Sequence, residues 1–350
     1  VYHNMRCLLH EKPFAGVNGS GKHNNWSLST DNGVNLLEPG ASPERNIQFL
    51  LILSCILKAI DTHAELLRQS ASDVGNDLRL GADEAPPAIV SIFLGEQLED
   101  VVRQLVETGS ADSHIEGGIL RTGVSTLPDI NKDATDRNRT SPFAFTGNKF
   151  EFRMVGSADS CASPITIINA IVAEAFCEAA DLLEHADNFN KAVHDLIKDN
   201  MTKHQRIIFS GNGYSEEWVR EAERRGLPNI RSTIEAASAL TSEKSIRLFE
   251  KFGIFTESEL RSREEIIYET YAKTQNIEVL TMIDMAHKQI LPACMQYARN
   301  LAETVVIMRK AGSGTRSAVS HILEQLGLEE PDLNVFAHLD DQEATKNLVE

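Results

Sequence analysis

The sequence predicts an α+β protein in which a β-sheet flanked by helices comes first and a mostly α-helical part follows. Short apolar stretches alternate with Gly, Asn, Ser and Pro in residues 1–40, as in strands joined by turns. Apolar and polar residues alternate in KFEFRM, residues 149–154, as in a strand with one polar face. From Ser163-Pro164 onward, helix-start signals and helical periodicity predominate. We therefore expect two domains, residues 1–165 and 166–350.

The first half begins with a strand candidate, MRCLLHE, at residues 5–11. Ser42 followed by Pro43 provides a cap and a proline at the first helical position, so we expect a helix from there to about Gln69. Residues 78–95 predict a loop with two prolines, followed by a strand rich in β-forming residues.

Two further stretches precede the alternating strand. Glu96 to Thr108 has the pattern of a short amphipathic helix. Residues 109–135 are polar and predict an excursion on the surface, so residues 96–135 are expected to form an insertion.

The second half carries helix boundaries that can be located by residue type. Two pairs have the spacing of a capping box: Ser232 with Glu235, and Thr256 with Glu259. Gly226 and Gly253 stand where helices are expected to end. Residues 257–310 predict one long helix that Pro292 should kink or break. Four histidines on these predicted helices are expected to be solvated or capping residues: His185, His194, His204 and His287.

Composition limits the possible partners. The 350 residues carry a formal net charge of -17, with 42% hydrophobic and 24% charged residues. Such a charge repels phosphate backbones and anionic lipids, so we expect neither a nucleic acid nor a membrane as a partner. The longest apolar run, residues 47–57, is too short to span a bilayer.

Cysteine usage and the start of the chain bear on its setting. The five cysteines include no C-x-x-C pair: Cys7, Cys55, Cys161, Cys177 and Cys294. This spacing indicates neither a disulfide framework nor a zinc site, and favours the cytoplasm or the lumen of an organelle. The chain starts at Val1 within an apolar stretch, without a visible signal peptide, so we expect upstream sequence to be missing.

The densest chemical signal is EKPFAGVNGSGKHNNWS, residues 11–27. Gly16 and Gly21-Lys22 match the spacing of a phosphate-binding P-loop. However, His23 replaces the Ser or Thr that would hold magnesium, and the following residues are a poor helix start. We therefore predict that Lys22 does not cradle a phosphate, and keep the P-loop as a less favoured alternative.

The same segment strongly resembles the signature of the glutamine synthetase family, in which Lys-Pro precedes Asn-Gly-Ser-Gly, one residue and His. The chemistry of these residues suits a ligand site. Glycines let the backbone approach a ligand closely, Asn18 offers an amide, and His23 offers a neutral nitrogen to a divalent metal. Without the resemblance, His23 would be an ordinary loop histidine.

Two further segments resemble the same family. In LRLGADEAP, residues 78–86, Arg79 and Glu84 occupy the places of a glutamate-binding arginine and of an acid on a mobile flap. DRNRTSP and the following strand place Arg139 as a phosphate-contacting arginine. That strand also matches at Lys149, Glu151 and Arg153: a nucleotide contact, a metal ligand and a substrate contact. Glu151 and Arg153 are two residues apart in a strand, so they share one face, and a cross-strand ion-pair patch is the alternative.

The chain also departs from the commoner form of the family. Ala144 stands where that form has a further arginine, and Asn25 where it has a second histidine, so some phosphate contacts must be supplied differently. LTMIDMAHKQILPA, residues 280–293, resembles the type III branch, as does DRNRTSPFAFTGNKFEFRM, residues 136–154. The resemblance covers nearly the whole chain.

The resemblance implies ATP-dependent ligation of ammonia to glutamate, through a γ-glutamyl phosphate, with Mg²⁺ or Mn²⁺. The implied metal ligands are His23 and Glu151. The implied catalytic residues are Glu84, Arg139 and Arg153. Glutamate would be bound by Asn18, Gly19, Arg79 and Arg153. ATP would be bound by Asn25, Ser27, Arg139 and Lys149.

The resemblance also implies part of the family's catalytic β-sheet, a helical C-terminal domain and a homo-oligomeric ring, a dodecamer. Because the family's other metal ligands lie on strands upstream of the signature, residues 1–350 alone are expected to be inactive. A relative that keeps the scaffold for assembly or regulation without catalysis remains the alternative from another class.

Overall fold

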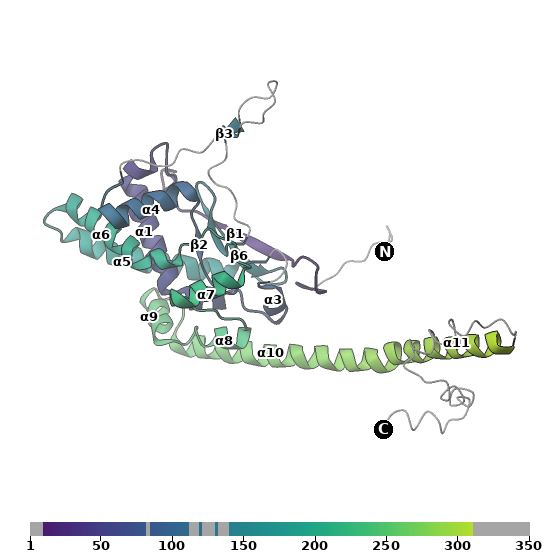
Figure 1. Cartoon of the computed structure of the whole chain (residues 1–350). Helices are drawn as coiled ribbons and strands as arrows, with labels where there is room; N and C mark the ends of the chain where they lie inside the picture. The colour runs from purple at the N-terminus through teal and green to yellow at the C-terminus, as the bar shows by residue number, and fades with distance from the viewer. Residues whose placement is uncertain (1–9, 82–84, 112–118, 121–129, 132–139, 311–350) are drawn as a thin grey trace. The chain divides into compact units, whose positions relative to one another are not determined.

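The computed structural model describes residues 10–81, 85–111, 119–120, 130–131 and 140–310. By its contacts the chain divides into two units, Val1–Ala272 and Lys273–Glu350 (Figure 1). The helices from α5 (Ala162–Glu184) to α9 (Glu243–Lys251) therefore group with the sheet, and the expected domain boundary near residue 165 stays a prediction.

The first unit contains a four-stranded mixed sheet with the order β1-β6-β5-β2. Strand β1 (Gly21–Trp26) pairs antiparallel with β6 (Phe150–Gly156), which pairs antiparallel with β5 (Phe143–Phe145). The short strand β2 (Ile92–Phe93) is parallel to β5. A separate pair, β3 (Ile119–Leu120) and β4 (Ile130–Asn131), lies within the predicted excursion.

One hydrophobic core joins the sheet to the helices that cover it. Its aromatic centre comes from one face of the sheet, where the rings of Phe143 and Phe150 stack at 4.7 Å. Helices α1 (Ile47–Thr62), α5 (Ala162–Glu184) and α6 (Phe189–His204) pack together, and Figure 1 shows them side by side. Helix α4 (Glu96–Thr108) packs against α6 and has the predicted bounds. The α+β class is therefore confirmed.

The first helix differs from its prediction at both ends. Ser42 and Pro43 begin only a 3-10 turn, η1 (Pro43–Arg45), and the Ser42 side chain makes no capping hydrogen bond. Asn46 caps α1 instead, because its Oδ1 accepts from the backbone N–H of Phe49 at 3.0 Å. The helix then breaks at His63, and α2 (Ala64–Gln69) follows. The predicted start of α5 is also shifted: Cys161 occupies the cap position, and Ser163 and Pro164 lie inside the helix.

The remaining helices of the first unit are shorter. They are α3 (Val74–Arg79), η2 (Gln205–Ile207), α7 (Glu216–Arg224), α8 (Thr233–Ala237) and α9 (Glu243–Lys251). Both predicted capping boxes are present, at Ser232 with Glu235 and at Thr256 with Glu259.

The two predicted glycine helix ends are confirmed in detail. Gly226 and Gly253 have φ of 70° and 62° and follow α7 and α9. After each glycine, the next N–H bonds back to the helix, from Leu227 to the Ala222 carbonyl and from Ile254 to the Phe249 carbonyl, both at 2.9 Å. This is the Schellman motif, which requires the left-handed conformation that glycine adopts without strain.

The long helix is interrupted where the proline predicted an interruption. Helix α10 (Glu257–Met285) is followed by a π-helical turn, η3 (Ala286–Ile290), and then by α11 (Leu291–Lys310). Pro292 lies at the second position of α11, so the wider turn directly precedes the residue that cannot donate a helical hydrogen bond.

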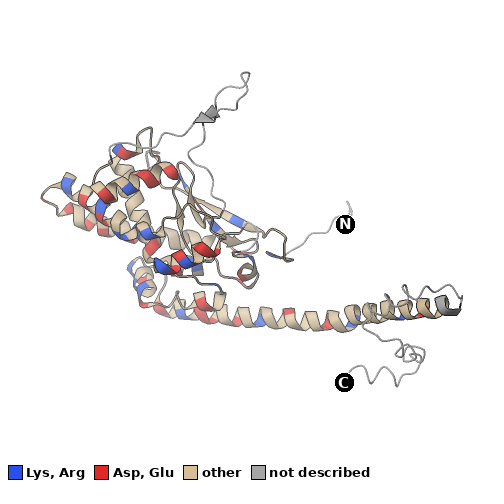
Figure 2. Ribbon diagram, viewed as in Figure 1, with Lys and Arg blue, Asp and Glu red and all other residues tan. Residues whose placement is uncertain are grey.

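The predicted absence of nucleic-acid and membrane partners stays a prediction. Figure 2 shows Lys and Arg interspersed with Asp and Glu along the described helices. Within the described ranges, no helix combines the length and the hydropathy needed to cross a bilayer.

Candidate active site

The site is built on one face of the pair β1–β6. In β1, Asn24 and Trp26 are buried on the core side, so His23 and Asn25 lie on the opposite face. Asn25 pairs directly with Glu151 of β6, which places Glu151, and Arg153 two residues on, on that same face. The register of the two strands shifts between Lys22 and Asn24, so His23 occupies an irregularity of the kind that re-aims side chains near active sites.

His23, Glu151 and Arg153 come together as the sequence predicts. The Nδ1 atom of His23 is 3.8 Å from Oε2 of Glu151, and the two side chains are 53% and 10% exposed. Arg153 donates from Nη2 and Nε to the same Oε2, at 3.1 and 3.3 Å. The strand KFEFRM is therefore polar on one face as predicted, but that face is buried here rather than facing water.

These residues fit a hard divalent cation. One ion can reach donors that are 3.8 Å apart through bonds of about 2.0–2.3 Å. An imidazole nitrogen and a carboxylate suit Mg²⁺ or Mn²⁺, and no thiolate belongs to the pair. Among the described residues, no third His, Cys, Asp or Glu joins a metal-binding group. Arg153 donates to the same oxygen of Glu151, Oε2, that faces His23.

Arg79 lies beneath the signature loop, where only 4% of its surface is exposed. Its Nη1 donates to Oδ1 of Asn76 at 3.0 Å and to the carbonyls of Met154 and Val155 at 3.1 and 3.2 Å, while Nη2 donates to the carbonyl of Arg153 at 3.2 Å. These bonds attach the end of α3 to β6. Burial lowers the pKa of Arg79, and the charges of Glu11, Tyr214 and Asp159 oppose that effect.

The glycines of Asn-Gly-Ser-Gly are needed because Arg79 packs against them. A Cβ added to Gly19 would lie 2.6 Å from Cγ of Arg79, and one added to Gly21 would lie 2.1 Å from its Nη2. In the structure, the group that approaches these glycines is a protein side chain, and the predicted approach of a ligand stays a prediction. Asn18 is exposed next to this contact.

Two of the predicted ATP contacts, Ser27 and Lys149, lie at the other end of β1. The hydroxyl of Ser27 donates to Oδ1 of Asn35 at 3.1 Å and to the carbonyl of Asn148 at 3.2 Å. These bonds attach Ser27 to the turn between β5 and β6, where Lys149 is half-buried. Arg79 thus lies near Gly21 at one end of β1, and Ser27 lies near Lys149 at the other end.

Two predicted residues, Glu84 and Arg139, lie outside the described residues, as does most of the strand candidate at residues 5–11. Ala144 is described, and it pairs directly with Glu151 across β5 and β6. The position that holds an arginine in the commoner form therefore lies beside the proposed metal ligand, where this chain places a methyl group.

The P-loop alternative is not supported. Lys22 lies in β1, which pairs antiparallel with β6, and a bridged loop rather than a helix follows the strand. The Nζ atom of Lys22 donates to the carbonyl of Asp159 at 2.5 Å.

Sequence reasoning did not find a group of carboxylates on the far side of Arg79. Glu11 is buried, Asp73 caps α3 by accepting from the N–H of Gly75 at 3.0 Å, and Asp159 follows β6. Burial raises the pKa of Asp159 to about 6, and Asp73 and Glu11 add to the rise. These residues are far apart in sequence and share no motif, so only the fold could reveal them.

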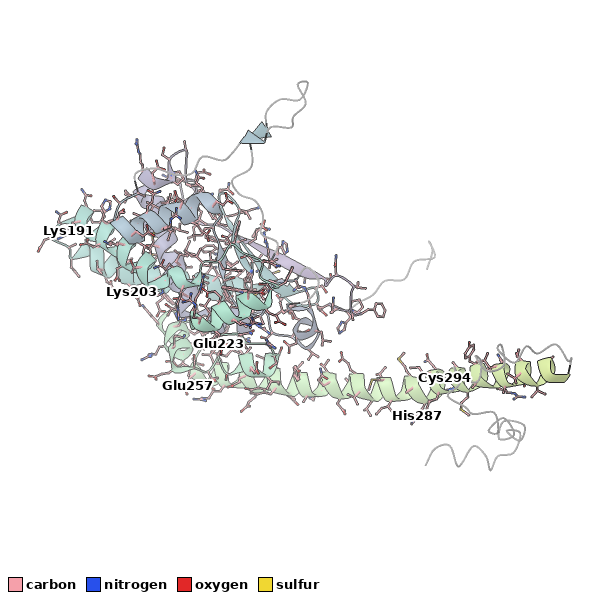
Figure 3. The ribbon with its side chains drawn as sticks, viewed as in Figure 1. Lys191, Lys203, Glu223, Glu257, His287 and Cys294 are labelled. Atoms are coloured by element: carbon pink, nitrogen blue, oxygen red, sulfur yellow. The ribbon has the colours of Figure 1, made fainter. Side chains whose placement is uncertain are left out.

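The histidine predictions hold for three residues and fail for one. His185, His194 and His287 are exposed, and Figure 3 labels His287 on the turn η3. His204 instead pairs with a buried carboxylate, since its Nδ1 is 2.7 Å from Oδ2 of Asp61. Arg206 donates to both oxygens of Asp61, at 2.9 and 3.1 Å, so the three side chains join α1 to η2.

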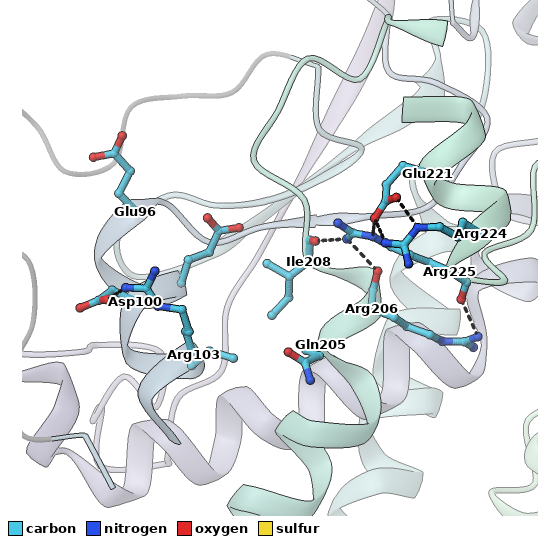
Figure 4. A pocket seen from close by; sticks show the side chains of 11 residues that line it. Glu96, Asp100, Arg103, Gln205, Arg206, Ile208, Glu221, Arg224 and Arg225 are labelled. Atoms are coloured by element: carbon cyan, nitrogen blue, oxygen red, sulfur yellow. Dashed lines mark hydrogen bonds and ion pairs between the residues drawn. The ribbon is translucent and has the colours of Figure 1, made fainter. Parts of the chain in front are cut away.

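A hollow of about 610 Å³ lies between α4, η2 and α7 (Figure 4). No residue of the predicted site lines it. Its four arginines already bond to protein groups: Arg224 and Arg225 to Glu221, Arg206 to Asp61, and Arg103 to Asp100. We therefore assign it no ligand.

Comparison with known proteins agrees with the resemblance. The model of the glutamine synthetase C-terminal domain matches residues 192–309. The chain is 45% identical to the type-3 glutamine synthetase of Dictyostelium discoideum over 99% of its own length and 46% of that protein. It is 45% identical to a glutamine synthetase of Butyrivibrio fibrisolvens and 44% identical to one of Bacteroides fragilis, over 87% and 88% of its length and 43% of each protein.

The chain therefore belongs to the glutamine synthetase family. The D. discoideum relative, which aligns with 99% of this chain, is named a type-3 glutamine synthetase. The chain spans less than half the length of the curated relatives it matches.

Proposed function

We propose that the protein joins ammonia to the side-chain carboxylate of glutamate, with ATP as the phosphoryl donor. The observation that carries the proposal is the convergence of His23, Glu151 and Arg153 on one face of β1–β6. These are a neutral nitrogen, a carboxylate and a guanidinium, the groups that phosphoryl transfer requires for binding a cation and stabilising phosphate charge. Membership of the family supports the choice of glutamate and ammonia as substrates.

The proposed roles rest on the family resemblance and on where the described residues lie along β1 and β6. His23 and Glu151 would hold Mg²⁺ or Mn²⁺, which supplies positive charge beside the transferring phosphoryl group. Arg153 would contact the substrate carboxylate, and Arg79 with Gly19 and Asn18 would position glutamate. The turn that holds Ser27 and Lys149 would contact ATP, with Asn25. By the family resemblance, Arg139 would stabilise the phosphoryl group and Glu84 would accept a proton from ammonium.

Isotope transfer tests the reaction and its intermediate together. Glutamate labelled with ¹⁸O in the side-chain carboxylate is incubated with ATP, Mg²⁺, ammonia and the protein as the organism makes it. A γ-glutamyl phosphate passes one carboxylate oxygen to phosphate when ammonia displaces it, so we expect one ¹⁸O in the phosphate for each glutamine formed. Glutamine without label in the phosphate would exclude this route, and the absence of glutamine would exclude the function.

We also propose that residues 1–350 alone do not form glutamine. The described part of the site supplies His23 and Glu151 as a ligand pair, whereas Mg²⁺ requires near-octahedral coordination. Each lost charge-stabilising contact costs roughly 10²–10³ in rate. A purified protein of these residues is assayed for ATP- and ammonia-dependent glutamine formation, and turnover equal to that of the D. discoideum relative would refute the proposal.

Assembly and location complete the proposal. We infer a homo-oligomeric ring from family membership, which light scattering coupled to size exclusion tests directly. The scattered cysteines favour a reduced compartment, cytoplasmic or within an organelle.

A further inference from the structure

Glu11 is a buried carboxylate to which neither the family signature nor the proposed mechanism gives a role. It directly precedes Lys12-Pro13, and only 4% of its surface is exposed. Its Oε1 accepts from the N–H of Ala158 at 2.7 Å and from the hydroxyl of Ser157 at 3.4 Å. Its backbone carbonyl accepts from the N–H of Ser20 at 2.8 Å. One residue therefore joins the turn after β6 to the glycine loop of the site.

The other carboxylate oxygen faces the helix that carries Arg79. A Cβ added to Gly75 would lie 2.5 Å from Oε2 of Glu11, so this oxygen lies against the first turn of α3. Burial lowers the pKa of Arg79, and among the neighbouring charges Glu11 opposes this most strongly. The carboxylate thus lies where its charge favours the buried guanidinium.

The contacts of Arg79 explain why that charge matters. Among the described residues, the hydrogen bonds of Arg79 go to neutral oxygens, those of Asn76, Arg153, Met154 and Val155. Its Nε is buried and has no hydrogen-bond partner among the described residues. A buried cation bonded to neutral acceptors still needs a counter-charge, because the desolvation cost of the guanidinium is not offset otherwise.

We propose that Glu11 is a positioning residue that keeps Arg79 buried beneath Gly19 and Gly21, and so fixes the loop where glutamate is proposed to bind. The inference rests on the proposed function. Without the charge of Glu11, the buried guanidinium of Arg79 is stabilised by moving toward water. The glycine loop that packs on Arg79 then moves with it. Ser27 and Lys149 lie at the other end of β1, so the ATP contacts stay in place.

The test is steady-state kinetics of Glu11→Gln in the protein as the organism makes it. Glutamine keeps the length of the side chain and removes its charge. We expect the KM for glutamate to rise about tenfold or more, as for other residues that orient groups in direct contact with a ligand. The KM for ATP should stay within about twofold of wild type. Glu11→Asp keeps the charge and should lie nearer to wild type than Glu11→Gln.

A matched control separates positioning from general destabilisation. Asp61 is as buried as Glu11, at 6% against 4% exposed, and it bonds to His204 and Arg206 away from the site. Asp61→Asn should lower the melting temperature without changing the KM for glutamate. An unchanged glutamate KM in Glu11→Gln, or an equal rise in Asp61→Asn, would overturn the inference.

Glutamate binding measured by calorimetry gives a readout that does not depend on turnover. Weaker glutamate binding by Glu11→Gln than by wild type and Glu11→Asp, with ATP binding retained, supports the positioning role even if the wild-type protein forms no glutamine. In that case the proposed function fails and the inference stands on the binding constants. Equal glutamate binding by wild type and both variants overturns it.

Discussion

At the scale of single residues, Asp159 is a carboxyl group held partly out of water beside two others. Its buried Oδ2 has no hydrogen-bond partner among the described residues. Burial raises the pKa of Asp159 from 3.8 to about 6, with Asp73 and Glu11 next in importance. Between these two pH values the native protein holds a proton that the unfolded chain has lost. The contribution of Asp159 to the free energy of unfolding therefore falls as pH rises from 3.8 to about 6. Above this window, the native state carries the full cost of keeping the buried carboxylate ionised.

The direction of this pH dependence gives a first prediction. Asp159→Asn removes the penalty, so the variant should melt at a higher temperature than wild type at about pH 8 and show little difference at about pH 4. Thermal unfolding across this range, with the exposed Asp187→Asn as control, provides the measurement. A gain that is equal at both pH values would mean that charge is not its cause.

A second residue-scale prediction concerns Gly21. A Cβ there meets the guanidinium of Arg79, which its hydrogen bonds to β6 hold in place. Gly21→Ala should destabilise the protein by about 1–3 kcal/mol, the usual cost of overpacking. Denaturant unfolding measures this loss. In an Arg79→Ala background the same change should cost little, and an equal cost in both backgrounds would contradict the packing explanation.

At the scale of elements, the start of α1 shows how a local signal can be correct in kind and misplaced in detail. Ser42-Pro43 does begin a helical turn, but Asn46 makes the capping bond. Asn46→Ala should therefore cost about 1 kcal/mol of stability. Ser42→Ala should be nearly neutral, within about 0.5 kcal/mol. Chemical denaturation of the two variants decides which residue caps the helix.

The same comparison explains which elements could be predicted from sequence. Helix α4 and the ends of α7 and α9 have the predicted bounds because local residues determine them: an amphipathic pattern and two glycines. The break at His63 was not predicted, and there Nε2 of His63 lies 3.0 Å from Oε2 of Glu174 on α5, a residue distant in sequence. No local pattern encodes such a contact.

At the scale of the whole molecule, part of the site could be predicted from sequence and part could not. The motifs placed His23, Glu151 and Arg153 together, since strand alternation and the family signature both pointed to one face. The partners of Arg79 could not be predicted, because three of them are backbone carbonyls of β6 and the counter-charge comes from Glu11. The fate of His204 was missed for the same reason, as Asp61 lies on another helix.

The central claim is that His23 and Glu151 hold one metal ion for phosphoryl transfer, and metal titration of single and double variants tests it most directly. His23→Ala and Glu151→Gln are made in the protein as the organism makes it. Glutamine formation is followed as Mg²⁺ rises, and Mn²⁺ binding is measured in parallel by electron paramagnetic resonance. If both residues hold one ion, each single variant should need about 10–100-fold more metal for the same activity. The double variant should raise this metal requirement by less than the product of the two single increases. Unchanged metal dependence in either variant, or losses that multiply in full, would contradict a shared site.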